Sequence, residues 1–394
     1  MNFASRAAAL DSLLQTYQAY WQFNIYRDND QSHLEKYPTL LRFLQELNDE
    51  QVHVLQGDDA QLLRSIAPYF PAANEILALI TLNTSPAQTA TGEPPTAVPG
   101  RKWRQINAFI QAHNTITRPV LEWCSGKGYL SAAISQKFSL AATGLEIDAL
   151  LVAAGNSRAV SDSANYQIKA CDVLSECTSR YIEQDQHLLA LHACGGLHQH
   201  MLRVAVAHQC QQISLAPCCY HRYVKQYSSL STQCKSSLLE LTRDDLRTAV
   251  RQTRTARSGE TLARRTLQAW HLGFRAILEQ LGLNSDITLP SLPHSWSKRS
   301  FSEFCLELVE RKKLCISLPS QFAEFESIGW QRLQRVERVD LVRMAFRRAI
   351  ELRCVLDNVL FLEEHGYQCV LSVFCAPQLS PRNLLIQARK SLGQ

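Results

Sequence analysis

The chain has 394 residues, with 41 Lys and Arg against 36 Asp and Glu, and 46 % of its residues are hydrophobic. These values exclude a disordered chain and a small disulfide scaffold, and they predict two or three globular domains with a sizeable core. No apolar stretch reaches the roughly 18 to 20 residues that span a bilayer, and the N-terminus lacks the layout of a signal peptide. We therefore expect a cytoplasmic protein that binds no membrane.

Thirteen cysteines are scattered through the chain, often within apolar runs such as LHACG and SVFCA. In a chain of this size, the pattern predicts reduced and mostly buried thiols. No CxxC pair occurs, which argues against a zinc ribbon or a thioredoxin-type redox site.

The first part of the chain, 1–82, has apolar residues at helical spacing, as in Leu10, Leu13, Leu14 and Tyr17. We predict a small helical domain there. Residues 83–100 are rich in Thr, Pro, Ala and Gly, which is typical of a linker.

Short apolar runs then alternate with helical patterns over 101–221, namely PVLEW, AATGLEI, YQIKACDV, HLLALHAC and QQISLAP. This alternation predicts parallel strands in a doubly wound α/β fold. Residues 222–339 interrupt the rhythm and are interpreted as a basic helical insertion. The last part, 340–394, predicts one long helix over 340–364 and two strands, GYQCVLSVFC and NLLIQARK, whose short connection makes them antiparallel. This layout is typical of the Rossmann-like class I S-adenosylmethionine methyltransferases.

The stretch VLEWCSGKGYLS, 120–131, places two glycines directly after the first predicted strand. In an open α/β sheet the ligand lies at the carboxyl ends of the strands, and Gly126 and Gly128 allow the backbone to approach it closely. Glu122 would accept hydrogen bonds from the ammonium end of S-adenosylmethionine, whereas it would repel a nucleotide diphosphate.

Further side chains follow the next three strands. Glu146 is predicted to bind the ribose hydroxyls and Asp172 the adenine amino group, while His192 and Cys194 would lie beside the methyl group. The same glycines loosely fit a dinucleotide fingerprint with Glu146 as its ribose acid, so NAD stays an alternative. Taken singly, either acid could equally be a helix cap or a solvated loop residue.

EWCSGKGYLS, LHACGGLHQHML, APCCYHRY and the C-terminal segment from LDNVLF resemble the methyltransferase-domain family shared by glutathione-S-transferase-C-terminal-domain-containing and methyltransferase-like proteins. They are more distantly similar to transfer-RNA 2′-O-methyltransferases. The resemblance covers about 118–222 and 340–391, and it implies that Cys124 and Ser125 belong to the cofactor-binding turn. Cys124 departs from the pattern, because most methyltransferases have a glycine there.

APCCYHRY follows the fifth predicted strand and is expected to lie over the methyl group. Methyl transfer requires alignment of the acceptor and removal of its proton, so His221 is the preferred candidate base and His192 the second. Tyr220 would stack on an acceptor base, and Cys219 would line the pocket or act as a nucleophile. We predict no metal site, because no ligand spacing supports one, although the side chains of His192, Cys194, Cys218, Cys219 and His221 are of types that bind zinc.

Between Arg222 and Arg348 the chain has 22 Lys and Arg against 13 Asp and Glu. One set of arginines recurs every three or four residues and would form a stripe on a helix: Arg243, Arg247, Arg251, Arg254 and Arg257. A second set comprises Arg332, Arg335, Arg338, Arg343, Arg347 and Arg348. Arginine stripes suit phosphate contacts, although a solvated helix face is the simpler explanation.

Together these patterns predict an S-adenosylmethionine-dependent methyltransferase that acts on RNA, with transfer RNA preferred, and that contacts it through Arg247, Arg251 and Arg254. The alternatives are a methyltransferase for a protein or a small molecule, and an inactive methyltransferase fold that binds RNA or a partner. The sequence does not indicate the oligomeric state.

Overall fold

The protein is described here from a computed structural model, which covers 1–23, 25, 32–82, 100–113, 115–161, 164–191, 193–251, 258–284 and 287–391. Two compact units make up the chain. The first, called the sheet unit, comprises Met1–Gln15, Leu79–Val250 and Arg348–Gln394. The second, called the helical unit, comprises Thr16–Ala78 and Arg251–Arg347. These units divide the chain differently from the predicted domains, because the N-terminal helices and most of the insertion form one unit.

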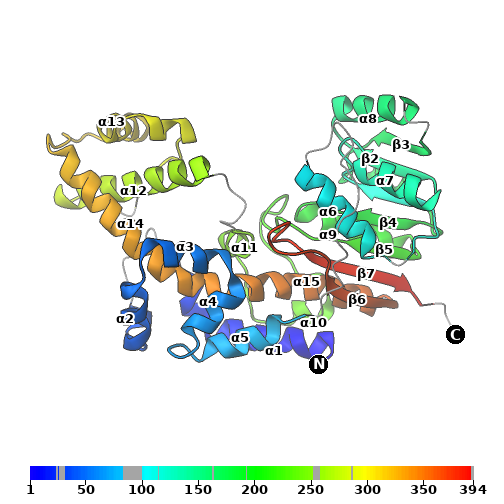
Figure 1. Ribbon diagram of the computed structural model, residues 1–394, viewed down its shortest axis with the longest axis horizontal. Helices are drawn as coiled ribbons and strands as arrows, with labels where there is room; N and C mark the ends of the chain where they lie inside the picture. Colours follow the sequence, from blue (N-terminus) through cyan, green and yellow to red (C-terminus); the bar gives the residue numbers. More distant parts are fainter. Residues whose placement is uncertain are drawn as a thin grey trace. The chain divides into compact units, whose positions relative to one another are not determined.

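The sheet unit is built on a seven-stranded sheet with the order β3-β2-β1-β4-β5-β7-β6 (Figure 1). The strands occupy the predicted runs: β1 Val120–Trp123, β2 Ala142–Glu146, β3 Tyr166–Ala170, β4 His187–Ala190, β5 Gln212–Leu215, β6 Tyr367–Val373 and β7 Leu384–Lys390. β1 to β5 pair in parallel, whereas β7 pairs antiparallel with both β5 and β6. The predicted class I methyltransferase fold is therefore confirmed.

Helices connect the parallel strands, because a parallel crossover needs a connection of this length. They are α7 Tyr129–Phe138, α8 Ala149–Ser161 and α9 Gly196–Ala207, and α6 Gly100–Gln111 precedes β1 and packs on α7. Apolar side chains of α6 and α7 form a core with the sheet, in which Phe109, Ile134 and Leu189 are completely buried. The core holds the carboxyl ends of β1, β2 and β4 in fixed register.

The helical unit contains α2 Pro38–Glu46, α3 Asp49–Gly57, α4 Asp59–Ile66, α12 Ser258–Gln280, α13 Phe301–Lys312 and α14 Phe322–Ala345. The long helix α14 packs against α12 and also against α2, α3 and α4. The apolar stripe of each short helix needs a partner, and α14 supplies it. This packing explains why 16–78 does not form a domain of its own.

The long helix predicted over 340–364 is two helices in the structure. α14 ends at Ala345, Phe346 caps it, and α15 runs over Arg347–Glu364. No proline or glycine lies at the break, so helical periodicity continues through it in the sequence. The border between the two compact units also falls here.

The remaining helices are α1 Phe3–Thr16, α5 Ala72–Ile80, α10 Thr232–Lys235 and α11 Arg243–Ala249. Short 3-10 turns lie at Gln18–Tyr20, Ser32–Leu34, Glu176–Tyr181 and His294–Lys298. Among the described helices, none has the length and hydropathy needed to cross a membrane. Of the predicted linker 83–100, only Gly100 lies within the described residues.

A buried carboxylate ties α15 to the segment that follows β5. Asp357 on α15 is completely buried. Its oxygens accept hydrogen bonds from the backbone N–H groups of Leu230 and Ser231 at 2.8 and 2.9 Å, from the Ser231 hydroxyl at 2.8 Å and from the Tyr227 hydroxyl at 2.9 Å. Asp357 is thus the acceptor for the backbone and hydroxyl donors of this segment, most of which are buried. The conformation of 227–231 therefore depends on Asp357.

We expect Asp357→Ala to lower the free energy of unfolding by about 3 kcal/mol or more, because several buried donors lose their acceptor at once. Tyr227→Phe removes a single hydrogen bond and should cost about 1 kcal/mol. Urea unfolding of both variants measures the difference. Equal losses in the two variants would contradict this account of Asp357.

Candidate active site

The turn between β1 and α7 has the geometry of a ligand-binding turn. Three of its residues have left-handed backbone: Cys124 at φ +56°, Gly126 at +59° and Gly128 at +66°. A Cβ at Gly128 would lie 2.8 Å from Ile168, so this glycine packs against β3. A Cβ at Gly126 would meet nothing within 4 Å, so Gly126 faces open space. The turn is thus packed on one side and free for a ligand on the other.

Cys124 occupies the position at which the resemblance implies a glycine. It nevertheless adopts left-handed backbone, which costs about 1 kcal/mol or more for a residue with a Cβ. Burial, followed by the charge of Glu146, raises the pKa of Cys124 to about 12, so the thiol stays neutral. Cys124 is therefore a strained and unreactive part of the turn. The Ser125 side chain lies beneath it, and a Cβ at Gly144 would approach the Ser125 hydroxyl to 2.4 Å.

Glu122 is buried at the end of β1 and binds the first turn of α7. Its Oε2 accepts hydrogen bonds from the Ser131 backbone N–H at 2.9 Å and from the Ser131 hydroxyl at 2.6 Å. Burial raises the pKa of Glu122 to about 7, and the bonds from Ser131 oppose the rise. In this structure Glu122 fixes the turn from within, while the predicted contact with the ammonium group stays a prediction.

Glu146 ends β2 beside the same turn. Its Oε2 accepts the Gly126 N–H at 2.9 Å and its Oε1 accepts the Asp148 N–H at 3.0 Å. Asp172 follows β3, is exposed, and accepts the Leu174 N–H at 3.0 Å. The structure thus brings the predicted acids to one edge of the sheet, in strand order. These acids fit a cofactor with a sulfonium, hydroxyl and amino groups better than one with phosphates.

The turn after β4 and the loop after β5 touch closely through two glycines. A Cβ at Gly195 would lie 2.0 Å from the carbonyl oxygen of Arg222, and one at Gly196 would lie 2.2 Å from that of Tyr223. The N–H of Gly195 donates to the carbonyl of Cys218 at 3.0 Å. Only glycine permits this approach, which sets the two loops in a fixed register.

Three thiols meet where these loops join. Sγ of Cys194 lies 3.4 Å from Sγ of Cys218, and both lie within 4.8 Å of Sγ of Cys219. Hydrogen bonds from Cys194 and Cys218 and the charges of Arg382 and Arg222 lower the pKa of Cys219 far below its usual value. None of the thirteen cysteines, all of which lie in the described part of the chain, is joined in a disulfide. The residue types had suggested these three cysteines as possible zinc ligands, but their spacing in the sequence did not predict the cluster.

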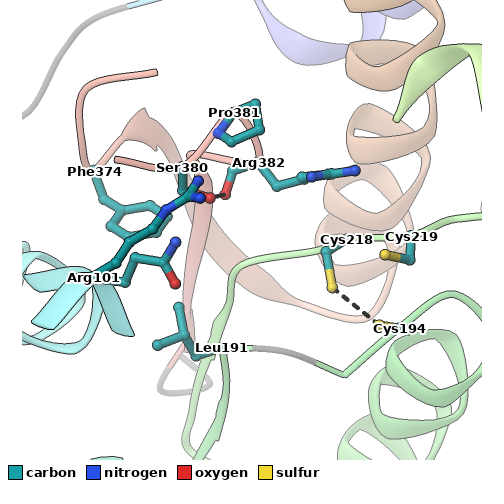
Figure 2. A pocket seen from close by; sticks show the side chains of 10 residues that line it. Arg101, Leu191, Cys194, Cys218, Cys219, Phe374, Ser380, Pro381 and Arg382 are labelled. Atoms are coloured by element: carbon teal, nitrogen blue, oxygen red, sulfur yellow. Dashed lines mark hydrogen bonds between the residues drawn. The ribbon is translucent and has the colours of Figure 1, made fainter. Parts of the chain in front are cut away.

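The thiols line a cavity of about 170 Å³ in the sheet unit, together with Arg101, Gln105, Leu191, Phe374, Ser380, Pro381 and Arg382 (Figure 2). Figure 2 shows Cys194, Cys218 and Cys219 on one side of this cavity and Arg101 on the other. Nε of Arg101 and Nε2 of Gln105 hold the loop before β7 by donating to the carbonyl of Leu379. The polar lining residues were missed because α6 lies before the quoted motifs, and the resemblance of the C-terminal segment assigned no role to single residues of the β6–β7 loop.

Two of the predicted catalytic residues do not line this cavity. Tyr220 is only 2 % exposed and its ring packs edge-on against His198, which rules out the predicted stacking on an acceptor base. His221 is half-buried with Nδ1 out of solvent, and burial lowers its pKa, so its imidazole is neutral and chemically able to act as a base. His192 lies outside the described residues.

The helix that carries Arg243 and Arg247 does not extend to Arg251, because α11 ends at Ala249. Arg247 pairs with Asp244 and Arg251 with Asp340, both at 2.5 Å, whereas Arg254 and Arg257 lie outside the described residues. Most of the second set also pairs with acids: Arg332 with Glu279, Arg338 with Asp49, Arg343 with Asp340, Arg347 with Asp59 and Arg348 with Glu351. These arginines mainly stabilise the fold.

One family of known proteins matches the part of the chain that contains most of this site. Residues 101–226 match a family described as a methyltransferase domain, and the strand order is that of class I S-adenosylmethionine-dependent enzymes. No curated protein matches the chain. The narrower resemblance to glutathione-S-transferase-C-terminal-domain-containing proteins and to transfer-RNA 2′-O-methyltransferases stays a prediction.

Several solved structures share limited similarity with the chain. The MccD protein is 18 % identical over 28 % of this chain and 51 % of its own, with a TM-score of 0.22. The magnesium protoporphyrin IX methyltransferase of Synechocystis PCC 6803 with bound SAH is 13 % identical over 40 % of this chain and 71 % of its own, with a TM-score of 0.23. Coclaurine N-methyltransferase is similar at 11 % identity over 86 % of this chain and 95 % of that one, with a TM-score of 0.27. The chain thus spans about half the length of MccD, and likenesses this weak do not bear on the substrate.

We expect the stability of the protein to depend on the ionisation of Glu122. The buried carboxyl binds its proton more tightly in the folded protein than in the unfolded chain, so folding is favoured while it is protonated. The free energy of unfolding should fall by up to about 3 kcal/mol as pH rises from 4.5 to about 7. Glu122→Gln should remove this part of the pH dependence. Urea titrations at several pH values measure the free energy of unfolding of both proteins. If it fell with pH equally in the wild type and in Glu122→Gln, the prediction would be contradicted.

Proposed function

We propose that this protein transfers a methyl group from S-adenosylmethionine to RNA, with transfer RNA as the preferred acceptor. The observation that carries the proposal is the edge of the sheet where three acids surround an open glycine turn, next to a cavity lined by arginines and thiols. S-adenosylmethionine supplies the electrophilic methyl group when bound. The three acids would bind the cofactor, and the cavity would bind the acceptor.

Within this scheme Glu146 would bind the ribose, since it already orients the open Gly126 through the backbone N–H. Asp172 is exposed and available for the adenine. Glu122 would position the turn that contacts the ammonium end of the cofactor, because it accepts a hydrogen bond from the Ser131 backbone N–H. The chain would use these residues for binding and alignment, which is most of what this reaction requires.

The support for RNA comes from exposed residues after β5, at the same end of the sheet. Tyr223 is 61 % exposed and stands between the exposed Arg222 and Lys225. The guanidinium of Arg243 lies beside the same segment, since its Nε donates to the carbonyl of His221 at 3.2 Å. An exposed ring among cations is suited to stack on a base and to contact phosphates. In this role Tyr223 takes the place of the buried Tyr220.

A small-molecule acceptor is the second candidate, because the volume of the cavity beside the thiols is of the order of that of a small ligand. Arg101 and Arg382 would favour an anionic acceptor there. Binding of S-adenosylmethionine without binding of RNA would favour this candidate. Binding of RNA without the cofactor would favour an inactive methyltransferase fold.

We expect Glu146→Ala to weaken binding of S-adenosylmethionine at least tenfold, because charged hydrogen bonds to the ribose are worth about 1.5 to 3 kcal/mol. Calorimetric titration with S-adenosylmethionine, S-adenosylhomocysteine and NAD measures this effect. Glu310→Ala is the matched control, since Glu310 is an exposed acid on α13 of the helical unit. Unchanged affinity in Glu146→Ala, or preference for NAD, would refute the assigned cofactor site.

We expect Tyr223→Ala to weaken binding of transfer RNA by about 1 to 3 kcal/mol through lost stacking. The double variant Arg222→Gln, Lys225→Gln should reduce the slope of log affinity against log salt by about 1.5 to 2, which corresponds to two lost phosphate contacts. Fluorescence anisotropy at several salt concentrations measures both effects. Lys312→Gln, in the helical unit, is the control for a general change of charge. Wild-type binding by both variants would exclude this surface.

A further inference from the structure

We propose that Cys194, Cys218 and Cys219 bind one zinc ion through their three sulfur atoms and leave its fourth position open to the adjoining cavity. The three sulfur atoms lie within 4.8 Å of one another, and those of Cys194 and Cys218 are separated by 3.4 Å. Sulfur atoms bound to one tetrahedral zinc, with Zn–S bonds of about 2.3 Å, are about 3.8 Å apart. Small shifts of the side chains would therefore bring all three into contact with a metal.

The backbone is arranged so that the thiols converge. Consecutive side chains of an extended segment point in opposite directions, so Cys218 and Cys219 would normally diverge. Cys219 instead adopts left-handed backbone, at φ +44°, and both thiols lie in the same cluster. Such backbone costs about 1 to 3 kcal/mol in a residue with a Cβ, and it persists only where its surroundings enforce it.

The third thiol, that of Cys194, is held in place at the end of β4. Cys194 and Cys218 form a parallel bridge beyond β4 and β5, and the N–H of Gly195 donates to the carbonyl of Cys218. The absent Cβ of Gly195 lets the carbonyl of Arg222 pack against it. The cluster is thus pre-organised on both sides, as a metal site requires.

The charges around the cluster suit a zinc–thiolate centre. Three thiolates and Zn²⁺ carry a net charge of −1, and the cations that act on Cys219 are Arg382 and Arg222. Arg382 also lines the cavity that adjoins the sulfur atoms. Three protein ligands with an open fourth position are the arrangement of catalytic zinc, whereas structural zinc has four.

A disulfide between Cys194 and Cys218 is the competing explanation of the short sulfur distance. It would use two of the sulfur atoms and leave the converging Cys219 unexplained. The metal site does not depend on the proposed methyl transfer, but its chemical role does. A zinc-bound acceptor atom loses its proton more readily, which would supply at the cavity the proton removal that was expected of His221, a residue that does not line it.

The experiment is a metal titration of the full-length protein, reduced and without S-adenosylmethionine. We expect about one equivalent of zinc to remain after dialysis, and cobalt to give the visible bands of a tetrahedral thiolate complex. Cys218→Ser and Cys219→Ser should each weaken zinc binding by about 100-fold or more, because loss of even a neighbour of a metal ligand costs 10- to 100-fold. Cys315→Ser changes an exposed cysteine of the helical unit and should bind as the wild type does.

Three results would overturn the proposal: no zinc retained by the reduced wild type, equal retention by the Cys218→Ser and Cys219→Ser variants, or a metal-free protein in which Cys194 and Cys218 are joined by a disulfide. Circular dichroism of each variant separates loss of a ligand from loss of the fold. Binding of S-adenosylmethionine, measured separately, distinguishes failure of the metal site from failure of the proposed function.

Discussion

The candidate active site depends on the contact between two glycines and the loop after β5. The carbonyl oxygens of Arg222 and Tyr223 occupy the space that a Cβ would take at Gly195 and Gly196. This contact holds the carboxyl ends of β4 and β5 together beyond their last paired residues. The thiol cluster, the exposed Tyr223 and the cations around it all lie on the backbone that this contact positions.

Charge is divided along the edge of the sheet. Glu122 and Glu146 lie at the ends of β1 and β2, and Asp172 follows β3, whereas Arg382 and Arg101 line the cavity next to β4 and β5. A positively charged sulfonium would be attracted to the acidic half, and an anionic acceptor to the basic half. The order of the strands thus produces two complementary sites from one sheet.

Three of the six non-glycine residues with left-handed backbone in the described part of the chain lie at these two sites. Cys124, Cys219 and Tyr223 are non-glycine residues with left-handed backbone, and each lies in a loop at the carboxyl end of a strand. Their conformations are unfavourable for residues with a Cβ, so the surrounding packing must enforce them. The packing of Gly128 and Gly155 against Ile168 shows how tightly one of these loops is held.

The sequence alone determined the strands, their alternation with helices, the glycine turn and the acids at three strand ends, because these features follow from local periodicity and from residues close in the chain. Only the tertiary structure decided which arginines are paired, since Arg251 and Asp340 lie far apart in the sequence. It also decided that Tyr220 is buried while Tyr223 is exposed. The thiol cluster depends on pairing between strands and on the left-handed backbone of Cys219, and neither leaves a periodic signal in the sequence.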